Sequence, residues 1–467
     1  MYRSSKSAKA LLSYLRMRGP TFSRELVADL GISRPTLSRR VRELGDALVP
    51  IGKGRATQLA ARHEAAGDAV PLYQVQESGK VDLFGRLTAL QQGETILWYM
   101  EPENPQAALC ADEFKEGLFP GWPWFLENVR PEGFLGRALG QQMSSLFGVD
   151  KDPGKWNDFE LLKVLVAFGA NLPGNFILGD GPALANFQKF RIEATGRSVP
   201  YLSASDYPEQ ARRALHEGEV YGSSAGGEQP KFTSIVGEAP EGVARAVLVK
   251  FSPGLETEVG RRWADLLQAE HLANETLREA GFATAQTRVL QYQDRIFLES
   301  ERFDRVGLSG RRGLVPLRAL DAAYIGQTGD SWAEAARKLH AGKLIKAEDR
   351  DRMIHLHCFG SLIANTDMHW GNLSFFLPGA PPFPLAPVYD MLPMHFRPSD
   401  TGEVPVRRFE PRLPKPENQA AWLEMYPHAL RYWQRIQQCT EISSPFQTIA
   451  EQAITALEKI HPIVAQS

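Results

Sequence analysis

Cysteine is scarce in this sequence, and long hydrophobic runs are absent. The three cysteines, Cys110, Cys358 and Cys439, lie far apart and include no CxxC pair. This spacing argues against a disulfide framework or a cysteine zinc cluster, and it favours a reducing compartment. The N-terminus has no apolar signal segment, and no uninterrupted apolar run reaches the roughly 18 residues of a membrane span. We therefore expect a cytoplasmic protein with no membrane contact.

The charge shows no large overall excess of one sign but is unevenly distributed. The chain has 467 residues, of which 43% are hydrophobic and 23% charged, and its formal net charge is -2. These values are ordinary for a globular protein, and the length allows about two to four domains. Residues 1–60, however, carry twelve Lys and Arg against four Asp and Glu. A basic head on an acidic body predicts a polyanion-binding module joined to another unit.

The basic head has the periodicity of a winged helix-turn-helix, in which one helix enters the major groove of DNA. Apolar residues at 8, 11, 12 and 15 share one helical face, and a second helix over 24–30 ends at Gly31. Ser33 can cap a third helix, a two-stranded wing follows over 48–59, and residues 61–70 resemble a linker. The candidate DNA contacts are Arg34, Thr36, Ser38, Arg39 and Arg40 on the third helix and Lys53 in the wing.

The most informative motif is a polar loop near residue 370. The string Asp367-Met368-His369-Trp370-Gly371-Asn372 has the form Asp-x-His-x-x-Asn, and Asp390 follows in Leu-Ala-Pro-Val-Tyr-Asp. Phosphoryl transfer from ATP needs a carboxylate that orients the acceptor hydroxyl. It also needs an amide and a second carboxylate that hold Mg2+ against the phosphates. The two strings together predict a kinase with Asp367, Asn372 and Asp390 in these roles.

Upstream segments supply candidates for nucleotide binding. Residues 222–231 are rich in small residues and end in Lys231, so backbone N–H groups can approach phosphates, although the pattern is neither a Walker A motif nor GxGxxG. A strand predicted over 246–251 carries Lys250, where a lysine can pair the α and β phosphates. Glu270, on a helix predicted over 264–280, is a candidate partner for this lysine. A hairpin over 289–299 leads into Glu301 and Phe303, which suits a hinge that binds adenine.

These motifs, in this order, resemble those of the HipA family of bacterial serine/threonine kinase toxins. They are Ser-Ala-Gly-Gly-Glu-Gln-Pro-Lys, Leu-Val-Lys-Phe, Glu-Arg-Phe-Asp-Arg, Asn-Thr-Asp-Met-His-Trp-Gly-Asn and Leu-Ala-Pro-Val-Tyr-Asp. The chain looks closest to the YjjJ-like branch, which carries an added N-terminal DNA-binding domain. The resemblance implies an α+β chain whose residues 1–66 form the winged helix-turn-helix. Residues 67–305 would form a mixed α/β N-lobe of a kinase-like fold, and residues 306–467 an all-α C-lobe with the catalytic and metal-binding loops.

The resemblance also implies a role for each site residue. Asp367 would be the base, Lys250 would pair with the phosphates of ATP, and Asn372 and Asp390 would hold Mg2+. The residues around the nucleotide would be Gly226, Gly227, Glu228, Gln229, Pro230, Lys231, Lys250, Glu301, Phe303, His369, Asn372, Tyr389 and Asp390. Ser224, with Ser223 as the second candidate, would be autophosphorylated. The added negative charge would repel the nucleotide and inactivate the kinase.

The resemblance says less about the binding partners than about the site residues. Related toxins phosphorylate aminoacyl-tRNA synthetases and so block translation, which makes these enzymes the default class of protein target. Family members usually pair with a separate DNA-binding antitoxin, whereas here the DNA-binding head is part of the chain. The fusion leaves open whether an antitoxin exists, and it favours autoregulation by the chain itself. A homodimer would let two heads read two half-sites.

Other functions stay open at this point. The chain could be a DNA-binding transcription regulator whose kinase-like body senses ATP. It could also be a small-molecule phosphotransferase of the aminoglycoside or choline kinase type, which shares the Asp-x-His-x-x-Asn logic. The head alone could be a three-helix bundle for protein contacts. The complete set of Lys250, Asp367, Asn372 and Asp390 argues against an inactive body, and the serines of the glycine-rich loop favour a protein kinase.

Overall fold

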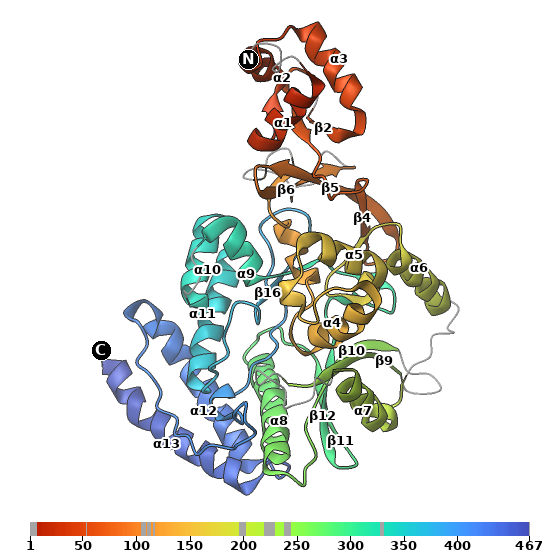
Figure 1. Ribbon diagram of the computed structural model, residues 1–467. Helices are drawn as coiled ribbons and strands as arrows, with labels where there is room; N and C mark the ends of the chain where they lie inside the picture. The colour runs from red at the N-terminus through yellow and green to blue at the C-terminus, as the bar shows by residue number, and fades with distance from the viewer. Residues whose placement is uncertain are drawn as a thin grey trace.

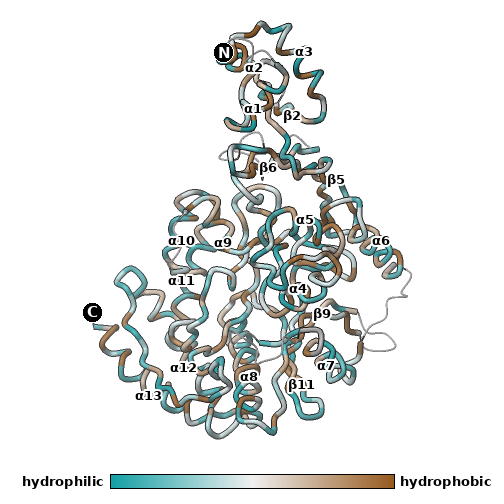
Figure 2. Tube along the Cα trace, in the orientation of Figure 1, coloured by the Kyte–Doolittle hydropathy of each residue, from teal (hydrophilic) through white to brown (hydrophobic). Residues whose placement is uncertain are grey.

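The fold is a mixed α+β arrangement with a small N-terminal unit at one end of a larger body (Figure 1). The computed structural model describes residues 7–52, 54–103, 109, 114, 117–195, 202–218, 229–237, 244–326 and 331–466. Hydrophobic and hydrophilic residues alternate along the helices, as expected for elements that bury one side (Figure 2). Across these described ranges, no helix is both long enough and apolar enough to span a bilayer.

In its described residues, the N-terminal unit contains three α-helices and an antiparallel sheet with the strand order β1-β3-β2. Its elements are α1 (Ala8–Arg18), β1 (Thr21–Phe22), α2 (Ser23–Asp29), α3 (Arg34–Leu44), β2 (Leu48–Ile51) and β3 (Gln58–Ala61). Ser33 caps α3 as predicted, because its hydroxyl accepts the Thr36 N–H at 3.3 Å. The helices enclose a core that includes Leu11, Leu15 and Leu26.

The N-terminal unit packs onto the body instead of hanging from a flexible segment. Ile51 and Ala60, both with no exposed surface, form a buried cluster with Leu90 and Tyr99 of the body. The segment that follows β3 also contacts the body, since the His63 N–H donates to the Ala89 carbonyl at 2.9 Å. The expectation of a linker over 61–70 is therefore wrong at its start. The polar composition of this segment gave no sign that the preceding strands bury apolar side chains on both faces.

The first sheet of the body has five strands in the order β7-β6-β5-β4-β8. Its strands are β4 (Val70–Val75), β5 (Val81–Gln92), β6 (Thr95–Pro102), β7 (Leu118–Pro120) and β8 (Phe176–Leu178). The helices that follow β7 and β8 are α4 (Gly133–Phe147), α5 (Asp158–Phe168) and α6 (Pro182–Thr195). Asn157 and Glu160 form a capping box at the start of α5, which explains why the apolar run after them is a helix.

A second antiparallel sheet, with the strand order β11-β12-β10-β9, carries Lys250. Its strands are β9 (Lys231–Val236), β10 (Arg245–Phe251), β11 (Thr287–Tyr292) and β12 (Arg295–Glu301), and its helices are α7 (Tyr207–Gly218) and α8 (Glu258–Glu279). Val247, Val249 and Phe251 are buried on the face that packs against Tyr207 of α7. Because successive residues of a strand point to opposite faces, Lys250 lies on the other face, where α8 packs.

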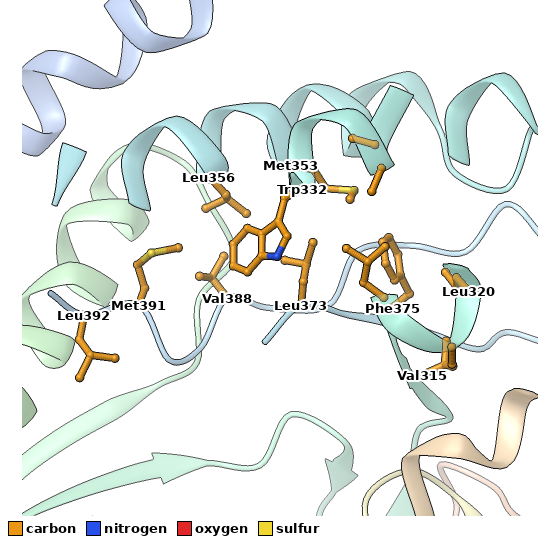
Figure 3. Close-up of a cluster of buried hydrophobic side chains, with 14 of the residues drawn as sticks. Val315, Leu320, Trp332, Met353, Leu356, Leu373, Phe375, Val388, Met391 and Leu392 are labelled. Atoms are coloured by element: carbon orange, nitrogen blue, oxygen red, sulfur yellow. The ribbon is translucent and has the colours of Figure 1, made fainter. Parts of the chain in front are cut away.

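The C-terminal part is mainly helical and surrounds the polar loop at 365–372. Its helices are α9 (Leu317–Leu320), α10 (Trp332–Ala341), α11 (Ala347–Leu362), α12 (Gln419–Gln438) and α13 (Ser444–Gln466). Figure 3 shows buried Trp332 and Leu356, from the helices, beside Leu373 and Val388, from the chain that follows the loop. The loop is therefore held between a helical layer and the chain that leads to Asp390.

The expectation of an all-α C-lobe is wrong. From residue 305 onward the structure also contains the short strands β13 (Arg305–Val306), β14 (Gly310–Arg311), β15 (Leu314–Pro316) and β16 (Ser374–Phe376). Strand β15 pairs antiparallel with β16, and Val315 and Phe375 have no exposed surface. Backbone groups at that depth need hydrogen-bond partners, and the pairing supplies them. The strands β13, β14 and β15 are too short for their periodicity to show in the sequence.

Candidate active site

Three charged side chains meet on the α8 face of the second sheet. Lys250 Nζ donates to the two carboxylate oxygens of Glu270 at 2.6 and 2.7 Å, and to Asp390 Oδ1 at 2.5 Å. Lys250 comes from β10, Glu270 from α8 and Asp390 from the loop after β16. Lys250 and Glu270 are only 4% and 2% exposed, so water screens their ion pair weakly. The structure thus places Glu270 beside Lys250, as the sequence suggested.

Each of these groups changes the pKa of the others. Burial disfavours the charged form of Lys250, but Asp390 and Glu270 outweigh it and raise the lysine pKa. Burial also opposes the charge on Asp390, yet Lys250 and Lys231 hold its pKa below the usual range. For Glu270 burial prevails over Lys250, and the pKa is raised. Asp390 is therefore the carboxylate that stays ionised and is suited to bind a cation.

The backbone around Asp390 is tightly held. Asp390 has a φ of 54°, in the left-handed region where Asp and Asn occur more often than most other residues. Two residues earlier, the Val388 N–H donates to the Ala283 carbonyl at 2.9 Å, and the Val388 carbonyl accepts the Ala285 N–H at 2.8 Å. These bonds join the Asp390 loop to the segment that leads into β11, so the carboxylate is aimed at Lys250 by the backbone.

Tyr389 connects the Asp390 loop to the Asp367 loop. Its hydroxyl donates to the Gly371 carbonyl at 2.8 Å and lies 2.7 Å from Ser374 Oγ. Burial raises the pKa of Tyr389, which keeps the phenol protonated as a donor. The Tyr389 and Phe303 rings have centroids 5.8 Å apart. The predicted hinge residue Phe303 thus lies beside the loops that carry the polar site residues.

The loop at 365–372 is closed by its own side chains. The Asp367 N–H donates to Asn365 Oδ1 at 3.0 Å, and Asn372 Nδ2 donates to the Asp367 carbonyl at 2.9 Å. His369 Nδ1 accepts the Gly371 N–H at 3.0 Å, so His369 braces the loop. The Asp367 side chain is half-buried, and burial raises its pKa, with Asp390 adding to the effect while His369 opposes it. A carboxylate of this kind can accept a proton from a hydroxyl.

Asn372 and Asp390 are chemically suited to Mg2+, which prefers carboxylate and amide oxygens and keeps several waters. Asn372 turns its NH2 toward the Asp367 carbonyl, which leaves Oδ1 for a ligand. Among the described residues, no three His, Cys, Asp or Glu side chains gather into a site that could hold a metal without other ligands. Lys231 lies across from Lys250 in the sheet, so two lysines add positive charge beside Asp390.

The end of the glycine-rich segment lies next to Lys250. Lys231 opens β9 directly across from Lys250, and the Pro230 carbonyl accepts the Phe251 N–H at 3.1 Å. Gln229 is only 9% exposed, and its Nε2 has no hydrogen-bond partner among the described residues. A buried amide donor without a partner is costly, so a ligand acceptor at this position would stabilise it. The structure therefore brings the last three residues of the predicted loop to the site.

The carboxylate of Glu301, a residue of the predicted hinge, has only a long ion pair with Arg245 among the described residues. It ends β12 opposite Val247, is half-buried, and its carboxylate is 3.8 Å from the Arg245 guanidinium. Five predicted residues of the glycine-rich loop, Ser223, Ser224, Gly226, Gly227 and Glu228, lie outside the described residues, as does Lys53 of the wing.

The predicted DNA contacts on α3 fall into two groups. Arg34, Ser38 and Arg39 are exposed. Thr36 instead is half-buried, and its hydroxyl lies 2.9 Å from Ser33 Oγ within the helix cap. Arg40 forms an ion pair with Glu43 at 2.7 Å. The first group presents free surface for a polyanion, whereas Thr36 mainly supports the start of the helix.

Sequence analysis missed two residues that hold the loop at 365–372. Asn365 is 4% exposed and its Oδ1 accepts the Asp367 N–H. An Asn that bonds the backbone two residues on is an Asx turn, and an Asn at the start of a polar loop is the signal that could have identified it. The Arg318 N–H donates to the Trp370 carbonyl at 3.1 Å, and its guanidinium pairs with Glu132. No local pattern marks Arg318, because its partners are distant in the sequence.

The fold has a counterpart among solved structures. It matches the HipA chain from Shewanella oneidensis MR-1, determined in a complex of HipA, HipB and operator DNA, with a TM-score of 0.54. The match covers 85% of this chain and 98% of that chain, at 16% identity. The protein is therefore an α+β protein with a HipA-like fold.

The sequence comparisons narrow this class to a family. Residues 66–187 match the YjjJ-like toxin, middle domain, and residues 223–460 match the HipA-like C-terminal domain. Toxin YjjJ from Escherichia coli (strain K12) is 36% identical over 458 residues, which cover 97% of this chain and 99% of that relative. The chain belongs to the YjjJ-like toxin family, and the family expected from the ordered motifs is confirmed.

Proposed function

We propose that this protein is an ATP- and Mg2+-dependent serine/threonine protein kinase that acts as the toxin of a toxin–antitoxin system. The observation that carries the proposal is the convergence of Lys250, Glu270 and Asp390, from three separate elements, beside the Asp367 loop. A strand lysine oriented by a helix glutamate, together with a base and two metal-binding side chains, is the set of groups that phosphoryl transfer needs. Membership of a toxin family supports the cellular role.

Each residue has a task in this proposal. Lys250, oriented by Glu270, exchanges its contact with Asp390 for the phosphates of ATP. Asn372 and Asp390 hold Mg2+, which when bound neutralises charge on the phosphates. Asp367 accepts a hydrogen bond from the substrate hydroxyl and takes its proton as the hydroxyl oxygen attacks the γ-phosphorus. The bond between that phosphorus and the β–γ bridging oxygen breaks, and ADP leaves with the electron pair. Adenine lies at the hinge near Glu301 and Phe303.

The regulation and the target extend the same proposal. Ser224, or Ser223, is the autophosphorylation site, and phosphate there repels the nucleotide and inactivates the kinase. The default target is an aminoacyl-tRNA synthetase, whose phosphorylation stops translation and growth. The proposed boundaries are 1–66 for the head, 67–305 for the N-lobe and 306–467 for the C-lobe.

The N-terminal unit is proposed to be a winged helix-turn-helix that binds operator DNA. Its order of helices and strands, the net charge of the first 60 residues and the exposed Arg34 and Arg39 support this. A separate antitoxin is a proposed partner, because the structural counterpart from Shewanella oneidensis was determined with HipB and operator DNA. Dimerisation would bring two heads onto one operator.

The test is to incubate the full-length protein with labelled ATP and Mg2+, beside Asp367→Asn and Ser224→Ala, with and without a set of bacterial aminoacyl-tRNA synthetases. We expect the wild type to label itself and one synthetase. Asp367→Asn should bind ATP and label neither, while Ser224→Ala should label the target for longer. ATP binding without any transfer would instead support a transcription regulator that senses ATP. Transfer only to an added aminoglycoside or choline would support a small-molecule phosphotransferase.

A further inference from the structure

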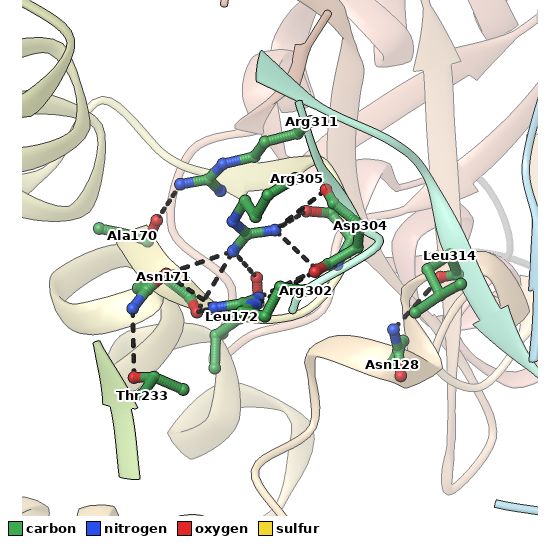
Figure 4. Close-up of polar contacts among 11 residues, drawn as sticks. Asn128, Ala170, Asn171, Leu172, Thr233, Arg302, Asp304, Arg305, Arg311 and Leu314 are labelled. Atoms are coloured by element: carbon green, nitrogen blue, oxygen red, sulfur yellow. Dashed lines mark hydrogen bonds and ion pairs between the residues drawn. The ribbon is translucent and has the colours of Figure 1, made fainter. Parts of the chain in front are cut away.

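The predicted hinge is surrounded by a buried network of ion pairs (Figure 4). Asp304 accepts hydrogen bonds from Arg302 at 3.1 and 2.9 Å and from Arg305 at 2.6 Å. The three side chains are at most 10% exposed, so water screens these ion pairs weakly. The Arg305 N–H also donates to the Arg302 carbonyl at 3.0 Å, which closes a turn around Phe303. The turn beside the proposed adenine site is therefore held in one shape.

This turn is also held from outside, by the segment between α5 and β8. The Gly174 N–H donates to Asp304 Oδ2 at 2.9 Å, although the two residues are 130 positions apart. Arg305 Nη2 donates to the Leu172 carbonyl, also at 2.9 Å. The segment belongs to residues 66–187, which we call the middle domain. The middle domain thus contacts the hinge directly through its backbone.

Asn171 is the side chain through which the middle domain reaches both arginines. Its Oδ1 accepts hydrogen bonds from Arg302 Nη1 at 3.0 Å and from Arg305 Nη2 at 3.3 Å. Its Nδ2 lies 3.5 Å from Thr233 Oγ1 on β9. Asn171 is itself exposed, so polar contacts and not apolar packing fix its position. One amide therefore joins the hinge to the second sheet.

The contact with Thr233 places this amide on the face of the second sheet that carries Lys250. Thr233 lies directly across from Leu248, and Leu248 is two residues before Lys250, so the three side chains share one face. A cavity of about 270 Å3 is lined by Asn171, Thr233 and Arg302 among others. Asn171 therefore lies between the hinge and the sheet that a nucleotide would contact.

We propose that the middle domain sets the affinity for ATP by holding the hinge, and that Asn171 is the positioning residue of this contact. The inference rests on the proposed function, because the hinge matters only if Glu301 and Phe303 hold adenine. With Asn171 in place the turn is ordered before ATP arrives, so binding does not include the cost of ordering it. Without the amide oxygen both guanidinium groups lose an acceptor, and the turn has to be ordered on binding.

The test is calorimetric titration of the full-length protein with ATP and Mg2+, in an Asp367→Asn parent that keeps the protein unphosphorylated. We expect Asn171→Leu to weaken ATP binding about three- to tenfold with little change in Tm, because the side chain is exposed. Asn186→Leu is the matched control. Asn186 is an exposed asparagine that lines the same cavity, and in the described structure it forms no hydrogen bond to Arg302 or Arg305.

Two further measurements separate a positioning role from a merely structural one. Asn171→Asp keeps an oxygen that accepts from both guanidinium groups, so it should recover most of the affinity that Asn171→Leu loses. Hydrogen exchange of the stretch 301–306, measured without nucleotide, should be faster in Asn171→Leu than in Asn171→Asp. These results are expected only if the amide oxygen orders the hinge.

The inference is overturned if Asn171→Leu binds ATP as tightly as Asn186→Leu, or if Asn171→Asp recovers none of the lost affinity. Equal hydrogen exchange of the hinge in the two Asn171 variants would also overturn it. A parent protein that binds no ATP at all would overturn the proposed function and this inference together. ATP binding that is equal in the two leucine variants would overturn this inference alone.

Discussion

Lys250 Nζ and Asp390 Oδ1 lie 2.5 Å apart, although 140 residues separate them in the chain. The contact joins the second sheet to the loop that follows β16. Glu270, from α8, is the other carboxylate that Lys250 contacts. Two carboxylates share the one buried lysine, so Lys250 has a second partner before a nucleotide arrives. Binding of phosphates would therefore replace one partner of Lys250 without leaving the lysine unpaired.

Replacing Lys250 should destabilise the fold as well as stop phosphoryl transfer. Lys250→Met leaves Glu270 and Asp390 close together without their cation, and we expect the free energy of unfolding to fall by about 3–5 kcal/mol. Adding Glu270→Gln should restore part of it, which urea unfolding of the single and double variants measures. Lys189→Met, from an exposed pair with Glu193, should cost at most about 1 kcal/mol. Equal urea midpoints for Lys250→Met and Lys189→Met would contradict this account.

Asn365 should act as a positioning residue for Asp367. Asn365→Ala removes the acceptor of the Asp367 N–H, so the loop loses its hold on the carboxylate. We expect kcat for phosphoryl transfer to fall by about 10–100-fold while the KM for ATP changes little, since the nucleotide contacts remain. Steady-state kinetics with labelled ATP separate the two constants. A loss that appears mainly in KM would show that Asn365 supports the nucleotide site instead.

Acidification should weaken the fold through Asp304. Burial opposes the charge on Asp304, but Arg302 and Arg305 hold its pKa well below the usual value. A carboxyl group with a lowered folded pKa stabilises the fold fully above its unfolded pKa of about 3.9, and the stabilisation is lost as the pH falls below that value. The wild type should therefore be more stable than Asp304→Asn at pH 7, and this difference should shrink below about pH 4.

Urea unfolding at a series of pH values checks this prediction. The exposed Asp68→Asn serves as the control and should follow the wild type throughout. A difference between the wild type and Asp304→Asn that stays constant down to pH 3 would mean that Asp304 is not the group responsible.

The contact between the N-terminal unit and the body should contribute to stability. Ile51 has no exposed surface, so Ile51→Ala should cost about 2–5 kcal/mol. Val406 is fully exposed, and Val406→Ala should stay within about 0.5 kcal/mol. If this packing holds the N-terminal unit against the body, Ile51→Ala should also speed proteolysis between β3 and β4. Unchanged proteolysis together with unchanged stability would indicate a loosely attached head.

DNA binding should depend on the exposed arginines of α3. Arg39→Ala removes one phosphate contact, so the slope of log K against log salt should fall by about 0.9. Arg352→Ala, on α11 beside Asp349, is the matched control and should leave the slope unchanged. Fluorescence anisotropy with promoter DNA at several salt concentrations measures both. Identical slopes for the two variants would show that Arg39 does not contact a DNA phosphate.

The sequence alone determined the local features of this protein. Ser33 marked the start of α3, and the strand that carries Lys250 could be recognised in the sequence. The ordered motifs around Asp367 and Asp390 were sufficient for the family. These features depend on residues close together in the chain, where caps, periodicity and spacing act directly.

Only the tertiary structure decided which distant residues meet. The pairing of β15 with β16, the contact of Arg318 with the Trp370 carbonyl, and the packing of Ile51 against Leu90 join segments far apart in sequence. The same holds for Arg311, whose guanidinium donates to the Ala170 carbonyl from a distant part of the chain (Figure 4). Burial and hydrogen bonding across the fold set these contacts, and no local pattern of residue types encodes them.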